Sequence, residues 1–400
     1  MKKRIYLDYA ASTPMDKKVL EAMMPYLKEE YGNASSAHTF GQKARAAVEG
    51  AREQVAAFLG CKADEVIFTS GATEANNLTI QGVIKSTLLF DRVPRVHHGA
   101  KPHIVTTAIE HESVLEPCKT LERRGIAEVT YVAPQKDGVV LAKDVQTAIK
   151  ESTVFVSVMY ANSEIGAIQP VAEIGQIIQE IRRNNKGSYP VFHIDAVQAA
   201  NYLDCNVEKL GCDLLTLSGH KIYGPKGVGV LYIKSKTPIG ALLEGGGQEL
   251  GMRSGTENVA AIVGMGQAIQ EIQSSKSKIQ NMQQLRDEFI KEVLQKISGS
   301  QVTGSLEKRL PNNVHVRFAG VQARDLVMLL DQKGVAASVG SACSEKTQEP
   351  SHVLGALGLS EAEAGSAARF TLGKDTTPKE MQQAVQALFE SVAQLQKNKI

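Results

Sequence analysis

Between residues 42 and 59, apolar side chains recur every three or four positions. This spacing predicts a helix with one apolar face, which ends at Gly60 because glycine readily adopts the C-cap conformation. Short apolar runs predict buried strands at residues 66–68, 104–106, 129–132, 153–159, 191–194, 214–217 and 228–233. Helical patterns, such as that of residues 171–183, separate most of these runs. The alternation predicts an α/β fold with a mainly parallel sheet covered on both faces.

The pattern changes after about residue 265. The elements expected there are a polar helix at 275–297, a strand at 314–318, a helix at 323–333, strands near 335–339 and 369–372, and a helix at 378–396. This mixture predicts a smaller α+β domain. Because single cores rarely grow beyond ~250–300 residues, we expect a large domain at 15–262 and a small domain made of 1–14 and 263–400.

Composition excludes several classes of protein. The 400 residues are 43% hydrophobic and 22% charged, with a net charge of +2, which argues against nucleic-acid binding. No apolar run approaches the ~20 residues of a membrane-spanning helix, and Asp8 interrupts the N-terminus before a signal peptide can form. Five cysteines without a CxxC pair predict a cytoplasmic protein with reduced thiols. In the irregular stretch 88–102 and at His103, histidines without interleaved carboxylates or cysteines favour a solvated loop over a metal site.

The first candidate site is Thr69-Ser70-Gly71-Ala72-Thr73-Glu74, which follows a predicted strand and opens a helix. Free N–H groups and the helix dipole make such an N-terminus a binding site for phosphate. The alternative is a capping box with Ser70 as N-cap and Thr73 or Glu74 behind it. The segment by itself favours neither interpretation decisively.

Two further sites follow predicted strands. Asp195 stands at the carboxyl end of a strand, where open α/β sheets bind ligands. Its carboxylate can hold a pyridine nitrogen protonated, although it can equally cap the next helix. Lys221 lies in Ser218-Gly219-His220-Lys221, and lysine forms Schiff bases with aldehyde cofactors. Ser218 and His220 can reach the same phosphate; the alternative is a surface lysine in a turn.

The three sites stand in the chain order of fold-type I enzymes, which use pyridoxal phosphate (PLP). Together with further motifs, they give the chain a strong resemblance to the cysteine desulfurases of the NifS/IscS group over nearly its whole length. The motifs lie at residues 6–11, 70–74, 110–111, 195–198, 218–221, 251–256, 340–343 and 369–370. The resemblance implies the PLP-dependent transferase fold and removal of sulfur from L-cysteine, which yields L-alanine and an enzyme persulfide.

The resemblance also implies a role for each matching residue. Lys221 would form the Schiff base and shuttle the substrate proton, while His111 would stack on the cofactor ring and act in acid–base steps. The other implied cofactor contacts are Ala72, Thr73, Ser218 and His220 at the phosphate, Asp195 at the pyridine nitrogen, and Gln198 with Asn162 or Ser163 at the ring oxygen. Thr256 would reach the phosphate of the neighbouring subunit, which implies a homodimer.

The resemblance also implies which residues bind the substrate and which residue receives the sulfur. Asn33 and Arg369 would bind the substrate carboxylate, for which the planar guanidinium is well suited. Cys343 would receive the sulfur, since it is the only cysteine in a small, polar context, Gly340-Ser341-Ala342-Cys343. For the other four cysteines, a structural role is expected.

The chain departs from its relatives in a few places. Ser163 replaces the second asparagine of the usual Asn-Asn-Glu-Ile-Gly motif, and residues 88–102 resemble an insertion. We also expect the chain to lack the C-terminal extension by which some relatives meet an iron–sulfur scaffold. The sulfur acceptor stays open between iron–sulfur cluster assembly, tRNA thiolation and cofactor synthesis, because all three would use the same active site. Rival interpretations are a selenocysteine lyase, an aminotransferase of the same fold, and a silent scaffold or sulfur-carrier subunit.

Overall fold

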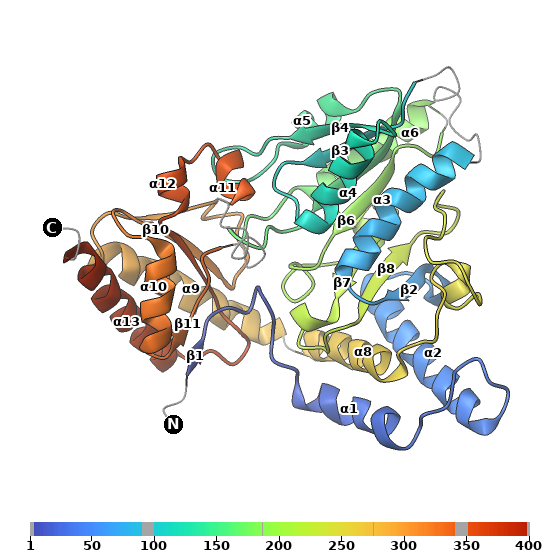
Figure 1. Cartoon of the computed structure of the whole chain (residues 1–400), viewed down its shortest axis with the longest axis horizontal. Coiled ribbons are helices and arrows are strands. Elements are labelled where there is room, and N and C mark those ends of the chain that lie inside the picture. The colour runs from blue at the N-terminus through green and yellow to red at the C-terminus, as the bar shows by residue number, and fades with distance from the viewer. Residues whose placement is uncertain (1–3, 90–99, 186, 275, 341–350, 398–400) are drawn as a thin grey trace.

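The computed structural model describes residues 4–89, 100–185, 187–274, 276–340 and 351–397. The chain forms a large sheet domain and a smaller lobe beside it, and both termini lie at the smaller lobe (Figure 1). The expected fold class, an α/β large domain with a smaller α+β domain, is confirmed.

A seven-stranded sheet is the centre of the large domain, with the strand order β2-β8-β7-β6-β5-β3-β4. The strands are β2 (Val66–Thr69), β3 (His103–Thr107), β4 (Glu128–Val132), β5 (Thr153–Met159), β6 (Val191–Asp195), β7 (Leu214–Ser218) and β8 (Gly229–Ile233). Only β8 runs antiparallel to its neighbours β2 and β7, so the sheet is mainly parallel. Each predicted apolar run is a strand, with ends that differ by at most one residue.

Helices cover both faces of this sheet, as parallel strands require. Successive residues of β2 alternate between two cores: Val66 and Phe68 pack in one, and Ile67 packs in the other. The first core receives α1 (Lys17–Lys28), α2 (Thr39–Leu59), α5 (Ala142–Ala148), α6 (Val171–Asn185), α7 (Val207–Leu210) and α8 (Val259–Ser274). The second receives α3 (Ala72–Leu89) and α4 (Glu112–Arg123). Helix α2 ends at Gly60, whose φ of 70° is left-handed, as predicted.

The smaller lobe has a three-stranded antiparallel sheet of the order β12-β10-β9. Its elements are α9 (Lys276–Lys296), β9 (Ser300–Val302), β10 (Asn313–Phe318), α10 (Ala323–Gln332), α11 (His352–Ala356), α12 (Glu361–Ala364), β12 (Ala367–Thr371) and α13 (Pro378–Lys397). At one side, β1 (Ile5–Tyr6) pairs in parallel with β11 (Val335–Ala336). The chain therefore begins in the smaller lobe, crosses the large domain and returns.

The chain passes from the core of the large domain to the core of the smaller lobe between α8 and α9. Ile269 still packs in the core of the large domain, whereas Met282 already belongs to the core of the smaller lobe. Three short 3-10 helices complete the described elements: Ala63–Glu65, Gly219–Lys221 and Glu249–Gly251.

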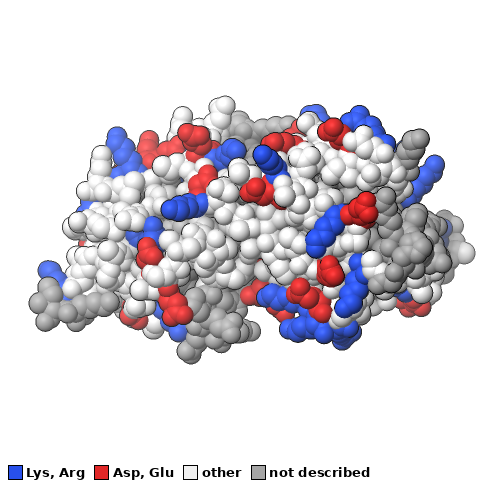
Figure 2. Space-filling model, turned by 90° about the horizontal axis from the view of Figure 1, so that it is seen from above, with Lys and Arg blue, Asp and Glu red and all other residues white. Residues whose placement is uncertain are grey.

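The surface is mixed in charge. In Figure 2, lysine and arginine side chains are interspersed with aspartate and glutamate on the face that is seen, without a continuous basic stripe. Across the described part of the chain, no helix combines the length and the apolar character needed to cross a bilayer.

Candidate active site

A cavity of about 610 Å³ opens where β5, β6 and β7 end. This is the edge at which open α/β sheets bind ligands. Its walls unite predicted site residues from distant parts of the chain: Ala72, Thr73, His111, Ser163, Asp195, Gln198, Ser218, His220, Lys221 and Arg369. The sequence therefore identified most of the side chains that meet in one place.

The turn from β2 into α3 forms one wall. Ala72 and Thr73 begin α3 and line the cavity, so the positive end of the helix dipole faces it. The capping interpretation holds in part, since Glu74 Oε2 accepts a hydrogen bond from the Ser70 backbone N–H (2.9 Å). Glu74 Oε1 also accepts from Arg253 Nε (2.8 Å). The helix start is thus fixed by its own carboxylate and still presents N–H groups for an anion.

Lys221 ends the 3-10 turn Gly219–Lys221, which directly follows β7. Its Nζ donates to the carbonyl oxygens of Ala10 (2.6 Å) and Ala11 (2.8 Å), and Asn201 Nδ2 donates to the Lys221 carbonyl (2.7 Å). The amine is therefore directed into the cavity by the N-terminal segment, which rules out the surface lysine considered as the alternative.

Asp195 is only 6% exposed at the end of β6. Its Oδ1 accepts from the Val197 N–H (3.0 Å) within a turn, whereas the next helix, α7, begins only at Val207, so Asp195 does not cap a helix. Its Oδ2 accepts from Asn76 Nδ2 (2.8 Å), and Asn76 also donates to Ser113 Oγ (2.9 Å). Sequence reasoning missed Asn76; the available signal was a fully buried amide within the apolar face of α3.

The tautomer of His111 follows from the same network. Ser113 Oγ accepts from Asn76 and therefore donates to His111 Nδ1 (2.8 Å), while the Ser113 backbone N–H also points at this nitrogen (3.1 Å). Nδ1 is thus an acceptor, and the neutral ring carries its proton on Nε2. Burial lowers the pKa of His111, although Asp195 acts in the opposite direction. A neutral imidazole is suited to stack on a ring and to donate from Nε2.

Asn162 and Ser163 point in different directions. Asn162 Oδ1 accepts from the N–H groups of Glu164 (2.9 Å) and Ile165 (3.0 Å), and its Nδ2 donates to the Ile109 carbonyl (3.0 Å). This side chain is therefore fully engaged by its own turn and by Ile109, whereas Ser163 is among the residues that line the cavity.

Arg369 reaches the cavity from β12 of the smaller lobe and is 2% exposed. Its Nη1 donates to the Ser163 carbonyl (3.0 Å), and its Nη2 donates to Asp8 Oδ1 (2.8 Å). Asn33 and Thr256 are exposed and do not line the cavity of this chain. Cys343 lies outside the described residues, so its predicted role rests on the sequence.

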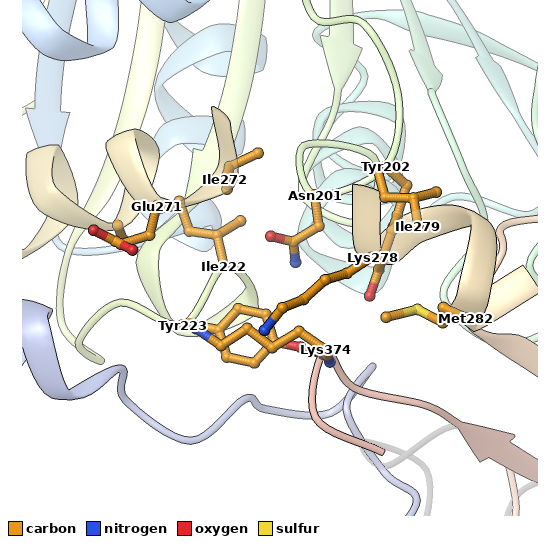
Figure 3. A pocket seen from close by; sticks show the side chains of 11 residues that line it. Asn201, Tyr202, Ile222, Tyr223, Glu271, Ile272, Lys278, Ile279, Met282 and Lys374 are labelled. Carbon is orange, nitrogen blue, oxygen red and sulfur yellow. Dashed lines mark hydrogen bonds between the residues drawn. The ribbon is translucent and has the colours of Figure 1, made fainter. Parts of the chain in front are cut away.

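A second and much smaller cavity lies between Ile222–Tyr223 and the helices α8 and α9 (Figure 3). Ile222 and Tyr223 form one wall, and side chains of α8 and α9, such as Ile272 and Met282, form another. Its volume of about 30 Å³ leaves room for one or two water molecules. None of the predicted site residues lines it, so the chemistry belongs to the larger cavity.

The donor set of the larger cavity fits PLP group by group. A lysine amine suits the aldehyde, a buried carboxylate suits the pyridine nitrogen, and the helix start with Ser218 and His220 suits the phosphate. With the mainly parallel sheet and the smaller lobe, this set defines a fold-type I PLP-dependent enzyme.

Comparison with known proteins gives the family. The chain belongs to the aminotransferase class-V family, whose model matches residues 5–384, and within it to the NifS/IscS group of cysteine desulfurases. It is 44% identical over 397 residues to the cysteine desulfurase IscS of Dictyoglomus turgidum, covering 99% of this chain and 96% of that protein. It is 41% identical to cysteine desulfurase IscS 1 of Archaeoglobus fulgidus, covering 96% and 95%.

Solved structures agree with this family. A NifS-like protein superposes with a TM-score of 0.87 at 36% identity, covering 98% of this chain and 99% of that one. The protein SspA in complex with cysteine superposes with a TM-score of 0.77 at 36% identity, covering 92% and 98%. The family and fold that the motifs implied are both confirmed.

Proposed function

We propose that the protein is a cysteine desulfurase, which converts L-cysteine to L-alanine and collects the sulfur as a persulfide on Cys343. The observation that carries the proposal is the meeting of Lys221, Asp195 and Arg369 in one cavity. These groups supply an amine, a ring-nitrogen partner and a carboxylate-binding guanidinium, which an α-amino acid substrate requires. The relatives named cysteine desulfurase, and the neighbour solved with cysteine, support the choice of substrate.

The residues of the cavity bind the cofactor in three places. Lys221 would hold the cofactor aldehyde, Asp195 would pair with the pyridine nitrogen, and the start of α3 with Ser218 and His220 would bind the phosphate. Gln198, whose Nε2 donates to the Ala10 carbonyl (3.0 Å), lies beside Lys221 and faces the same space. When bound, PLP supplies an electron sink for negative charge at the substrate Cα.

The substrate is oriented and deprotonated by side chains of this chain. Arg369 binds the substrate carboxylate, and Asn33 is proposed to assist. Lys221 would take the proton from Cα and later return a proton. Neutral His111 would lie over the cofactor ring, and its proton on Nε2 is available for donation.

Sulfur transfer requires a thiolate, which we assign to Cys343. Its thiolate attacks Sγ of the substrate; an S–S bond forms while the substrate Cβ–Sγ bond breaks. The electron pair of the broken bond stays with carbon, which takes a proton, so a thiol and L-cysteine give a persulfide and L-alanine. Burial raises the pKa of Cys61, Cys118 and Cys205 to about 12, so these thiols are poor nucleophiles at neutral pH.

The assembly and partners form part of the same proposal. Thr256 is exposed in a loop that also exposes Leu250, and we propose that it reaches the phosphate in a second copy of the chain, which makes a homodimer. The persulfide then passes to acceptor proteins, such as those of iron–sulfur cluster assembly or tRNA thiolation. A thiol that must be regenerated after each transfer suits the reducing cytoplasm.

Intact mass spectrometry tests the proposal. Protein loaded with PLP is incubated with L-cysteine without reductant, and wild type is compared with Cys343→Ala and with Cys61→Ala as a matched cysteine control. Wild type and Cys61→Ala should each gain sulfur mass and release alanine, whereas Cys343→Ala should not. Sulfur delivery by Cys343→Ala at the wild-type rate would refute the role of Cys343, and cysteine turnover that needs a keto acid would indicate an aminotransferase.

A further inference from the structure

Glu164 occupies an unusual place beside the active site. It follows Ser163, which lines the cavity, yet its own side chain is 3% exposed and points elsewhere. Its backbone is fixed from two sides: Asn162 Oδ1 accepts from its N–H (2.9 Å), and Asn313 Nδ2 of the smaller lobe donates to its carbonyl (2.9 Å). The carboxylate is therefore held rigidly relative to the cavity.

One carboxylate oxygen of Glu164, Oε2, lies close to both Ser351 and Gly340. The Ser351 hydroxyl donates to Oε2 (2.6 Å), and a Cβ added to Gly340 would lie 3.3 Å from the same Oε2. Gly340 and Ser351 are the described residues on either side of residues 341–350, which include Cys343. Glu164 thus accepts a hydrogen bond from the residue at one end of this stretch, Ser351, and lies close to the residue at the other end, Gly340.

Gly340 and Ser351 are each constrained by further local structure. Gly340 has a φ of 111°, which favours glycine, and its added Cβ would also lie 3.6 Å from His315 Nε2 on the side of β10. Ser351 accepts from the Leu354 N–H (3.2 Å) and so caps α11. The Ser351 hydroxyl therefore joins the start of α11 to the turn that carries Ser163.

We propose that Glu164 is a positioning residue for sulfur transfer: it holds Ser351 and the start of α11 against the turn that carries Ser163, and the transfer of sulfur to Cys343 depends on this bond. The inference rests on the proposed function, because it presumes that Cys343 is the acceptor. It adds a residue that touches neither cofactor nor substrate. Glu164 acts on the transfer step and leaves deprotonation of Cα to Lys221.

Two measurements separate these steps. Exchange of the Cα proton of L-alanine into deuterated water requires the cofactor and Lys221 and does not use Cys343. Persulfide formation from L-cysteine, measured as a single-turnover rate, requires the cofactor, Lys221 and Cys343. For Glu164→Ala and Ser351→Ala, persulfide formation should fall about tenfold or more, the size expected for loss of one hydrogen bond to a carboxyl group. The exchange rate should stay within about twofold of wild type.

Matched variants complete the test. Glu164→Gln keeps an acceptor oxygen for Ser351 and should restore most of the persulfide rate. Ser360→Ala removes a serine that caps the next short helix, α12, without any contact to Glu164, and should behave as wild type in both assays.

The outcomes distinguish the two proposals. A wild-type chain that forms no persulfide on Cys343 overturns the proposed function and this inference with it. If wild type does form it, an unchanged persulfide rate in Glu164→Ala and Ser351→Ala overturns the inference alone. Equal loss of exchange and persulfide formation in both variants also overturns it, since a purely structural role would impair both steps.

Discussion

The contact between Asn76 and Asp195 offers a severe test of the active-site assignment. Asn76 is fully buried, and its Nδ2 lies 2.8 Å from Asp195 Oδ2. The substitution Asn76→Asp preserves size and shape but replaces this donor with an oxygen. Two carboxyl groups would then face each other in a site shielded from water.

The magnitude follows from Coulomb's law. Two unit charges at this separation repel by about 6 kcal/mol with an effective dielectric constant of about 20. One carboxyl group must therefore keep a proton at neutral pH, as in other buried carboxyl pairs. Asp195 then shares its charge with a neighbour and holds the ring nitrogen protonated less often. We expect Asn76→Asp to lower Cα-proton exchange by about a hundredfold or more, and Asn76→Ala by about tenfold, for loss of a single hydrogen bond to a charged group.

The assay combines cofactor absorbance with exchange of the Cα proton of L-alanine into deuterated water. Asn185→Asp adds the same charge at an exposed position near the end of α6 and serves as the control. If Asn76→Asp retains both cofactor and exchange at the level of Asn185→Asp, then Asp195 is not the carboxylate on which the ring nitrogen depends.

Further predictions concern stability and pH. Arg52 forms a buried two-bond ion pair with Glu249 (2.8 and 2.9 Å), so Glu249→Ala should cost about 3–5 kcal/mol, whereas replacing both residues with apolar ones should cost less; urea denaturation measures both. Burial raises the pKa of Glu110 to about 8, so the native state holds a proton that the unfolded chain releases, and wild-type stability should fall from about pH 4.5 to pH 8. Glu110→Gln should lack this decline when melting temperatures are compared across that range; equal slopes would contradict it. Ser113→Ala removes the hydroxyl bond to His111 Nδ1 and should slow exchange about three- to tenfold with cofactor binding retained; loss of the cofactor would instead point to a structural role.

Sequence patterns were sufficient for the large sheet because most of its strands are buried along their whole length. Such a strand reads as a mainly apolar run, as in residues 153–159, which coincide with β5. Short strands gave no such signal: β1 has two residues, and β9 is partly exposed. The change of core between α8 and α9 was equally hidden, because one helical pattern runs almost directly into the next.

Motifs predicted which residues belong to the site, whereas only the structure shows which of them line one cavity and which partners they bind. Asn162 hydrogen-bonds within its turn, whereas its neighbour Ser163 lines the cavity. The residue types alone do not predict which of the two belongs to the cavity. Asn76 stands among apolar residues of α3 and acquires its partner Asp195 only through tertiary packing. Glu164 contacts Ser351, 187 positions away. Such contacts depend on the approach of distant segments, which local periodicity does not encode.

The pairing of β1 with β11 bears on how the enzyme is made in a cell. The carbonyl groups that hold Lys221 belong to Ala10 and Ala11, just after β1, and Asp8 meets Arg369 across 361 positions of sequence. A ribosome must therefore synthesise nearly the whole chain before Asp8 can meet Arg369 and β1 can pair with β11, although the strands of the large sheet are complete by Ile233. The N-terminal residues leave the ribosome first but are among the last to form their tertiary contacts. Cofactor capture is accordingly expected as a late event in biogenesis, after release of the nascent chain.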